Sequence, residues 1–151
     1  MNKELKVPLI KDGTVIDHIT AGNAVQVLHI IGIPKGSSSV VSVAMNVKSK
    51  MGKKDIVKVE NRELDSKEVD KIALIAPKAT INIIRDYEVV RKHKVELSNE
   101  IVGIVKCANP TCVSNTNEPV ESRFKVICRD PPRIKCCYCE REPEDIADRI
   151  I

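Results

Sequence analysis

Aromatic residues are scarce in this chain of 151 residues, which contains no tryptophan, one phenylalanine and two tyrosines. Its hydrophobic core must therefore be built from aliphatic side chains. The scarcity also argues against a domain that binds RNA by stacking bases on sheet aromatics. Tyr87 is the one aromatic residue among the first 97, and we expect it at a strand boundary.

Long apolar runs and catalytic motifs are missing as well. No run of about 18 apolar residues is present, so no membrane span is predicted. No signal peptide is recognisable, and we expect a cytoplasmic protein. The sequence has no P-loop, no G-x-G-x-x-G, no nucleophile elbow and no H-x-E near its cysteines. The three histidines, His18, His29 and His93, fall in unrelated elements, so we predict no catalytic residue and no enzyme.

Cysteines, in contrast, are arranged in a specific pattern. Cys107 and Cys112 form a C-x4-C pair, and Cys136 and Cys139 form a C-x2-C pair 23 residues further on. Two such pairs on tight turns are typical of a four-thiolate zinc site. Four thiolates leave no open position for water, so we expect one structural Zn²⁺ per chain and no zinc-dependent catalysis. Disulfides, buried thiols and a redox C-x-x-C remain the alternatives, and Cys128 and Cys137 lie outside the pattern.

Charge is unevenly distributed. Residues 1–97 carry 17 Lys and Arg against 12 Asp and Glu, whereas residues 98–151 carry 8 against 9. The excess positive charge lies in the part without cysteines. A zinc ribbon that grips nucleic-acid phosphates is normally basic itself. A zinc-ribbon nucleic-acid-binding protein is therefore the alternative interpretation, and we expect no nucleic-acid partner.

Hydrophobic periodicity predicts strands and helices in the order β-α-β-β-α-β. The fold class is thus α+β, a ferredoxin-like sandwich over residues 1–97 followed by a small β-rich zinc-binding domain over 98–151. About 54 residues are too few for a robust core without a metal. Simple alternation places Ile19 on the face opposite Ile16. The predicted strands are 14–19, 40–47, 55–60, 80–85, 87–95, 102–106 and 123–127, the helices 22–31 and 64–76, and the basic loop 48–54.

Polar and basic residues gather on adjoining elements of the first domain. Asp17 and His18 end the first strand, Asn82 lies within the fourth, and lysines surround the predicted hairpin. Such a group suits an anionic ligand such as a triphosphate. A solvated basic face is the simpler alternative.

Several strings along the whole chain resemble one family, the regulatory chains of aspartate carbamoyltransferase. The strings are Gly13-Thr-Val-Ile-Asp-His18, Met51-Gly-Lys-Lys-Asp55, Lys58-Val-Glu-Asn61, Ala76-Pro-Lys-Ala-Thr80, Tyr87-Glu-Val-Val90, Cys107-Ala-Asn-Pro-Thr-Cys112 and Cys136-Cys-Tyr-Cys139-Glu140. The resemblance implies a non-catalytic, allosteric subunit of pyrimidine biosynthesis. Such chains form homodimers through their nucleotide domains, and two catalytic trimers are joined by three regulatory dimers through the zinc domains. CTP is the inhibitor and ATP the competing activator, with UTP a further effector.

The resemblance also implies residue roles. It places zinc on Cys107, Cys112, Cys136 and Cys139, and Lys54 is a further candidate for nucleotide contact. Asn109, Glu118 and Glu140 are candidates for contact with the catalytic chain. The nucleotide-binding residues that it implies are Asp17, His18, Lys58, Asn82, Ile84, Tyr87, Val89 and Lys92.

Overall fold

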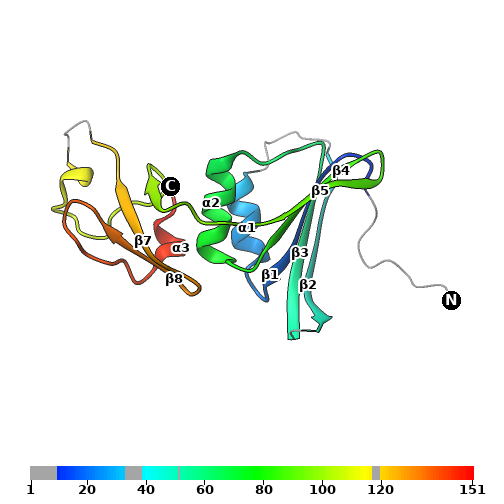
Figure 1. Cartoon of the computed structure of the whole chain (residues 1–151), viewed down its shortest axis with the longest axis horizontal. Coiled ribbons are helices and arrows are strands. Elements are labelled where there is room, and N and C mark those ends of the chain that lie inside the picture. The colour runs from blue at the N-terminus through cyan, green and yellow to red at the C-terminus, as the bar shows by residue number, and fades with distance from the viewer. Residues whose placement is uncertain (1–9, 33–38, 51, 117–119) are drawn as a thin grey trace.

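The computed structural model describes residues 10–32, 39–50, 52–116 and 120–151. A larger sheet with two helices forms the N-terminal part, and a smaller sheet with a short helix lies beside it (Figure 1). The expected α+β class with a separate C-terminal module is confirmed. The first elements are β1 (Gly13–Thr20), α1 (Ala24–Ile31), β2 (Val41–Ser49), β3 (Gly52–Glu60), α2 (Ser66–Ile75), β4 (Thr80–Arg85) and β5 (Glu88–Lys94).

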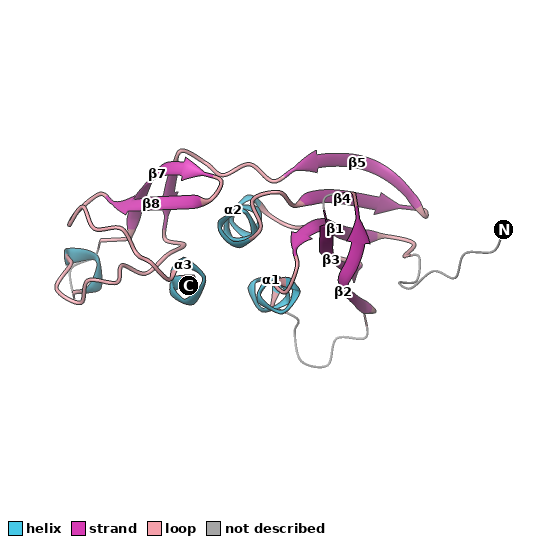
Figure 2. Ribbon diagram, turned by 90° about the horizontal axis from the view of Figure 1, so that it is seen from below, coloured by secondary structure: helices cyan, strands magenta, loops and turns pink. Residues whose placement is uncertain are grey.

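The larger sheet has the strand order β2-β3-β1-β4-β5, and every neighbouring pair is antiparallel. Helices α1 and α2 cover one face, as Figure 2 shows from below. The buried side chains on that face are aliphatic, among them Ile16, Val57 and Ile81. The opposite face carries none of the helices in the described part of the chain, and so it can present side chains to a ligand.

The two helices follow from their sequences. Helix α1 buries Ala24, Val27 and Ile31, the stripe that its periodicity predicts. Helix α2 begins with a capping box in which the Asp65 side chain accepts a hydrogen bond from the Glu68 amide at 2.8 Å. Both helices are confirmed, although α1 begins two residues later than the periodicity suggested.

Strict alternation along β1 is wrong. A β-bulge interrupts the pairing with β3 between Ile16 and Ile19, and His18 has a φ of 56°. One extra residue in the strand returns Ile19 to the core face, where it is fully buried beside Ile16. A second bulge interrupts β2 between Ala44 and Val47.

The basic loop predicted over residues 48–54 is largely strand. Lys48 pairs with Lys53 and Ser49 with Gly52, so β2 and β3 form a tight hairpin. Gly52 has a φ of 105°, a conformation that glycine adopts without steric cost. The lysines therefore lie on a protruding two-stranded ribbon rather than on an irregular loop (Figure 1).

The C-terminal module contains β6 (Glu100–Val102), the 3-10 turn η1 (Val113–Asn115), β7 (Arg123–Arg129), β8 (Pro132–Cys136) and α3 (Ile146–Arg149). The predicted strand over 102–106 is wrong, because Gly103 turns the chain with a φ of 68° and Val105 instead bridges to Ile150. Strand β7 is confirmed, whereas β8 and α3 were not predicted.

The two parts share a continuous core. The buried cluster runs from Ile16 and Ile72 through Ile104 to Phe124 and Cys136. Helix α2 contacts both α3 and β8. The small module therefore buries its apolar residues partly against α2. None of the helices in the described residues is long and apolar enough to cross a membrane.

Candidate functional site

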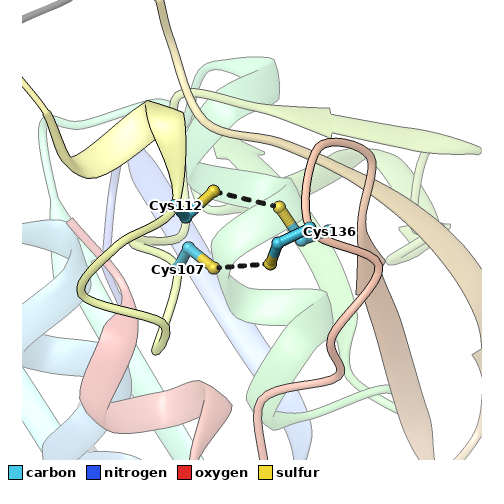
Figure 3. A group of neighbouring side chains, drawn as sticks. Cys107, Cys112 and Cys136 are labelled. Carbon is cyan, nitrogen blue, oxygen red and sulfur yellow. Dashed lines mark hydrogen bonds between the residues drawn. The ribbon is translucent and has the colours of Figure 1, made fainter.

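Four cysteines from two loops converge in the C-terminal module. Their sulfurs all lie within 4.8 Å of one another. The Sγ atoms of Cys107 and Cys139 are 3.5 Å apart, and those of Cys112 and Cys136 are 3.7 Å apart. Figure 3 shows the labelled side chains of Cys107, Cys112 and Cys136 pointing toward one another across the gap between the loops.

Local hydrogen bonds shape the first loop. The Asn109 carboxamide oxygen accepts bonds from the amide and hydroxyl of Thr111, at 3.2 and 2.9 Å. The Asn115 carboxamide donates to the carbonyl oxygens of Cys107 and Asn109. These contacts close the turn between Cys107 and Cys112, so Asn109 acts within the loop. Its predicted contact with a partner stays a prediction, and Glu118 lies outside the described residues.

The second loop begins at the end of β8. The Glu140 amide donates to the Cys136 carbonyl at 3.0 Å, and the Cys136 amide donates to the Arg141 carbonyl at 2.9 Å. The bond from Glu140 closes the turn that holds Cys136 and Cys139, and Glu140 has a φ of 63° where the chain leaves this turn. The predicted tight turn is therefore present.

The donor set fits a tetrahedral metal. Sulfurs bound to one Zn²⁺ at ~2.3 Å are separated by about 3.8 Å, close to the observed 3.5 and 3.7 Å. Burial raises the pKa of the Cys107 thiol to about 12. Burial also acts to raise the pKa of Cys139, but hydrogen bonds from the Arg141 backbone and the neighbouring thiols outweigh it and lower the pKa to about 7. Without a cation, such a cluster holds its protons unevenly, and a dication would favour thiolates throughout.

All six cysteines are free thiols, so no disulfide joins them. Cys128 lies in β7 and is half-buried, as expected of a strand residue. Cys137 is exposed and is not a member of the quartet. The structure thus brings together the four cysteines that the spacing selected and leaves out the other two.

The uncovered face of the larger sheet carries a row of polar side chains. Lys58 pairs with Val15, Val15 with Asn82, and Asn82 with Lys92, so these residues run directly across β3, β1, β4 and β5. Residues paired across antiparallel strands share a face. The row therefore brings Lys58, Asn82 and Lys92 side by side on the face opposite the helices.

A charged cluster adjoins this row. The Lys54 ammonium lies 2.9 Å from a carboxylate oxygen of Asp17. The amide of His18 donates to Asp17 at 2.7 Å, and its Nδ1 lies 3.3 Å from the hydroxyl of Thr80. Burial acts to raise the pKa of Asp17, but the Lys54 and His18 contacts outweigh it and lower that pKa. Asp17 is therefore held ionised at neutral pH.

Burial also affects the ionisation of Lys58. Burial lowers its pKa, and the negative charge of Asp17 opposes that effect without cancelling it. An anion bound next to the ammonium would favour the charged form. The electrostatics of the row thus suit a negatively charged ligand.

The remaining predicted residues lie toward the other end of β4. Ile84 pairs with Val89, and both share the face of Asn82. Tyr87 occupies the turn between β4 and β5, is 60% exposed, and donates its amide to the Lys11 carbonyl at 2.9 Å. From Thr80 to Ile84 the strand spans about 14 Å, so the candidate site is elongated.

A cavity of about 460 Å³ lies elsewhere, between α2 and the helix-facing side of β4 and β5. None of the predicted nucleotide residues lines it. Successive residues of β4 point to opposite faces of the sheet. Ile81 and Ile83 therefore face the cavity, whereas Asn82 and Ile84 face the open side. We place the candidate site on the open face, where the register gathers the charged side chains.

Sequence reasoning missed two residues of this region. Thr80 is buried and contacts His18, and Asp55 is fully buried among backbone amides. A period-two pattern counted from Asn82 places Thr80 on the same face, a signal that was available. Nothing in the sequence around Asp55 separates it from a surface carboxylate.

Two family models and several curated relatives match this chain. The family model for the aspartate carbamoyltransferase regulatory chain, allosteric domain, matches residues 5–96, and that for its metal binding domain matches residues 99–147. The regulatory chain of Methanothermobacter thermautotrophicus is 58% identical over 148 residues, covering 97% of this chain and 93% of the relative. That of Thermococcus gammatolerans is 56% identical, covering 97% and 99%, and that of Thermoplasma acidophilum is 48% identical, covering 93% and 94%.

Proposed function

Because the chain belongs to the family of aspartate carbamoyltransferase regulatory chains, we propose that it binds nucleoside triphosphates on its open sheet face and one structural Zn²⁺ on its four cysteines. It is a non-catalytic subunit with an allosteric and a metal-binding domain, and its partner is a catalytic chain. The effectors that we assign are CTP and ATP, which compete for one site, with UTP as a further ligand.

The observation that carries the nucleotide assignment is the row of Lys58, Asn82 and Lys92 across four strands. Two ammonium groups and a carboxamide at this spacing suit the phosphates and ribose of a nucleotide. In the proposed arrangement, backbone groups near Ile84 and Tyr87 read the base, beside Val89. The opposite end, with Asp17, His18 and Lys54, lies toward the phosphates.

Regulation then requires that the nucleotide binds one quaternary state more tightly than another. A coupling free energy of about 1–3 kcal/mol is typical of such systems. CTP and ATP differ in the base and share the triphosphate. Opposite effects must therefore arise at the Ile84–Tyr87 end of the site, where the base is read.

Calorimetric titration of the full chain with CTP and ATP tests this assignment. We expect saturable binding of each, mutual competition, and an affinity at least tenfold lower in Lys58→Gln and in Lys92→Gln. Lys78→Gln, at an exposed position outside the row, is the matched control and should bind as the unmodified chain does. Undiminished affinity in both row variants would overturn the proposed site.

The zinc assignment is supported by the sulfur spacing and by the all-thiol donor set, which suits a closed structural site. Elemental analysis of the purified chain should find one equivalent of zinc. Cys112→Ser should lose it, whereas Cys128→Ser, which alters a thiol outside the quartet, should keep it. Retention of a full equivalent by Cys112→Ser would contradict the ligand set.

We assign contact with the catalytic chain to the C-terminal module, because a metal-folded module with its own sheet is a natural docking unit. The assembly that we propose has two catalytic trimers joined by three regulatory dimers. Metal removal should abolish co-elution with purified catalytic trimers while CTP affinity changes less than twofold. Intact assembly of metal-free Cys112→Ser chain would refute this role.

The dimer that we propose forms between the allosteric domains. Among the described strands, β2 and β5 are the edges of the larger sheet. Strand β5 carries Arg91, Lys92, His93 and Lys94 in sequence, so two copies paired through it would bring cations together. Both edges expose apolar residues, Val89 and Val90 on β5 and Val43 and Met45 on β2. Strand β2 lacks such a run of cations and is the better pairing edge.

A further inference from the structure

Asp55 is a fully buried carboxylate that holds two separate segments. One oxygen accepts hydrogen bonds from the amides of Gly22 and Ala24, at 2.8 and 3.0 Å, where the chain passes from β1 into α1. The other accepts from the amide of Asn46 at 2.9 Å, in the bulge of β2. A single side chain of β3 therefore binds both of its neighbouring strand regions.

The bulges in β1 and β2 lie at the same level of the sheet, on either side of Asp55. Each contains a residue with positive φ, His18 at 56° and Asn46 at 59°. A bulge leaves an amide outside the strand ladder, and a buried amide needs an acceptor. Asp55 accepts from Asn46 and Asp17 accepts from His18, so a carboxylate satisfies each bulge.

Lys54, which precedes Asp55 on β3, connects these bulges to the candidate site. Asp55 pairs with Ile19 and belongs to the core side of β3, whereas Lys54 points to the open face and contacts Asp17. Asp55 thus lies behind the Lys54–Asp17 pair. It cannot touch a ligand on the open face, but it accepts bonds from the segment that follows β1 and from the β2 bulge beside the pair.

We infer that Asp55 is a positioning residue for nucleotide binding, acting through the Lys54–Asp17 pair and the β1 bulge. This inference rests on the proposed nucleotide site. A carboxylate supplies acceptors in both directions, toward the start of α1 and toward Asn46. A carboxamide of the same size supplies one acceptor oxygen and directs its NH₂ group at one of the amide donors. Asp55→Asn should therefore release one segment without changing core volume.

The test compares CTP binding by Asp55→Asn and by Thr14→Val in the full chain. Thr14 is also fully buried in β1 and donates its hydroxyl to the Arg62 carbonyl, away from the bulge. Thr14→Val controls for lost stability, and both variants are compared below their unfolding transitions. We expect at least a tenfold loss of CTP affinity in Asp55→Asn and less than twofold in Thr14→Val. Equal affinities in Asp55→Asn and the unmodified chain would overturn the inference.

A double-mutant cycle separates positioning from general softening of the fold. In a Lys54→Gln background the pair is already broken, so Asp55→Asn should cost much less affinity there than alone. If Asp55→Asn lowered CTP affinity by the same factor in that background, Asp55 would not act through the pair. If Asp55→Asn fails to fold, Asp55→Glu keeps the charge, shifts the carboxylate by one methylene, and is subject to the same two criteria.

Amide hydrogen exchange keeps this inference separate from the proposed function, because it needs no ligand. If the unmodified chain binds neither CTP nor ATP, the proposed nucleotide site is wrong. The structural part of the inference is then decided by the amides of Ala24 and Asn46, which both donate to Asp55. They should exchange at least tenfold faster in Asp55→Asn than in Thr14→Val, and equal exchange would refute the role of Asp55.

Discussion

Single residues decide how charge is held on the sheet face. Asp17 accepts bonds from Lys54 and from the His18 amide, and these contacts lower its pKa against the effect of burial. The resemblance carried by Gly13-Thr-Val-Ile-Asp-His18 predicted Asp17 as a residue of the candidate site. It could not show the Lys54 partner, because that contact joins residues 37 positions apart across a bulged strand pair.

The lowered pKa of Asp17 predicts a pH-dependent stability. A carboxylate with a folded pKa below its unfolded value of ~3.9 stabilises the fold above that pH, and the contribution is lost as the pH falls through the folded pKa. Asp17→Asn should therefore lower the free energy of unfolding by about 0.5–1 kcal/mol at pH 7. We would measure the free energy of unfolding of both proteins by urea denaturation from pH 3 to pH 7. The difference between Asp17→Asn and the unmodified chain should decrease toward zero below about pH 4.

Asp86→Asn serves as the control for that experiment, because Asp86 is exposed in the β4–β5 turn and asparagine tolerates its φ of 52°. It removes one negative charge from the same sheet without touching Lys54. If the difference in free energy of unfolding between Asp17→Asn and the unmodified chain stayed constant down to pH 3, the effect would not be ionic in origin.

At the scale of elements, the sequence predicts long periodic segments well and short ones poorly. The stripe of α1 and the capping box of α2 are local signals, and both are present. The three-residue β6 and the four-residue α3 carry too little periodicity to be recognised. The cysteine quartet was predicted in full because each pair depends only on its own turn. The two bulges were not, because they depend on the pairing with β3, and in β2 also on the bond that Asp55 accepts from Asn46.

The capping box of α2 gives a prediction at this scale. Asp65 and Glu68 each bind the other's backbone amide, which satisfies two donors at the helix start. Asp65→Ala should lower the free energy of unfolding by about 1 kcal/mol. Lys67→Ala, at an exposed position in the same first turn, should change it by less than half as much. Equal effects in denaturant titrations would mean that the cap contributes nothing.

For the whole molecule, the important fact is that α2 belongs to two layers at once. Its buried residues join the core of the larger sheet, and it also contacts α3 and β8 of the C-terminal module. The Lys71 ammonium bonds to the Ile151 carbonyl at 2.7 Å across the same boundary. A shift of the sheet on nucleotide binding would therefore reach the metal module through packed side chains, the physical requirement for coupling between distant sites.

The proposed dimer gives the prediction that tests the molecule as a whole. If two chains pair through β2, a charge on that edge is brought against its own copy and must be desolvated. Met45→Lys should therefore convert the chain to a monomer at micromolar concentration, as measured by sedimentation equilibrium. Val90→Lys, which changes a residue on β5 that is 53% exposed against 43% for Met45, should remain dimeric. A monomeric Val90→Lys beside a dimeric Met45→Lys would move the interface to β5, and the charge argument for β2 would fail.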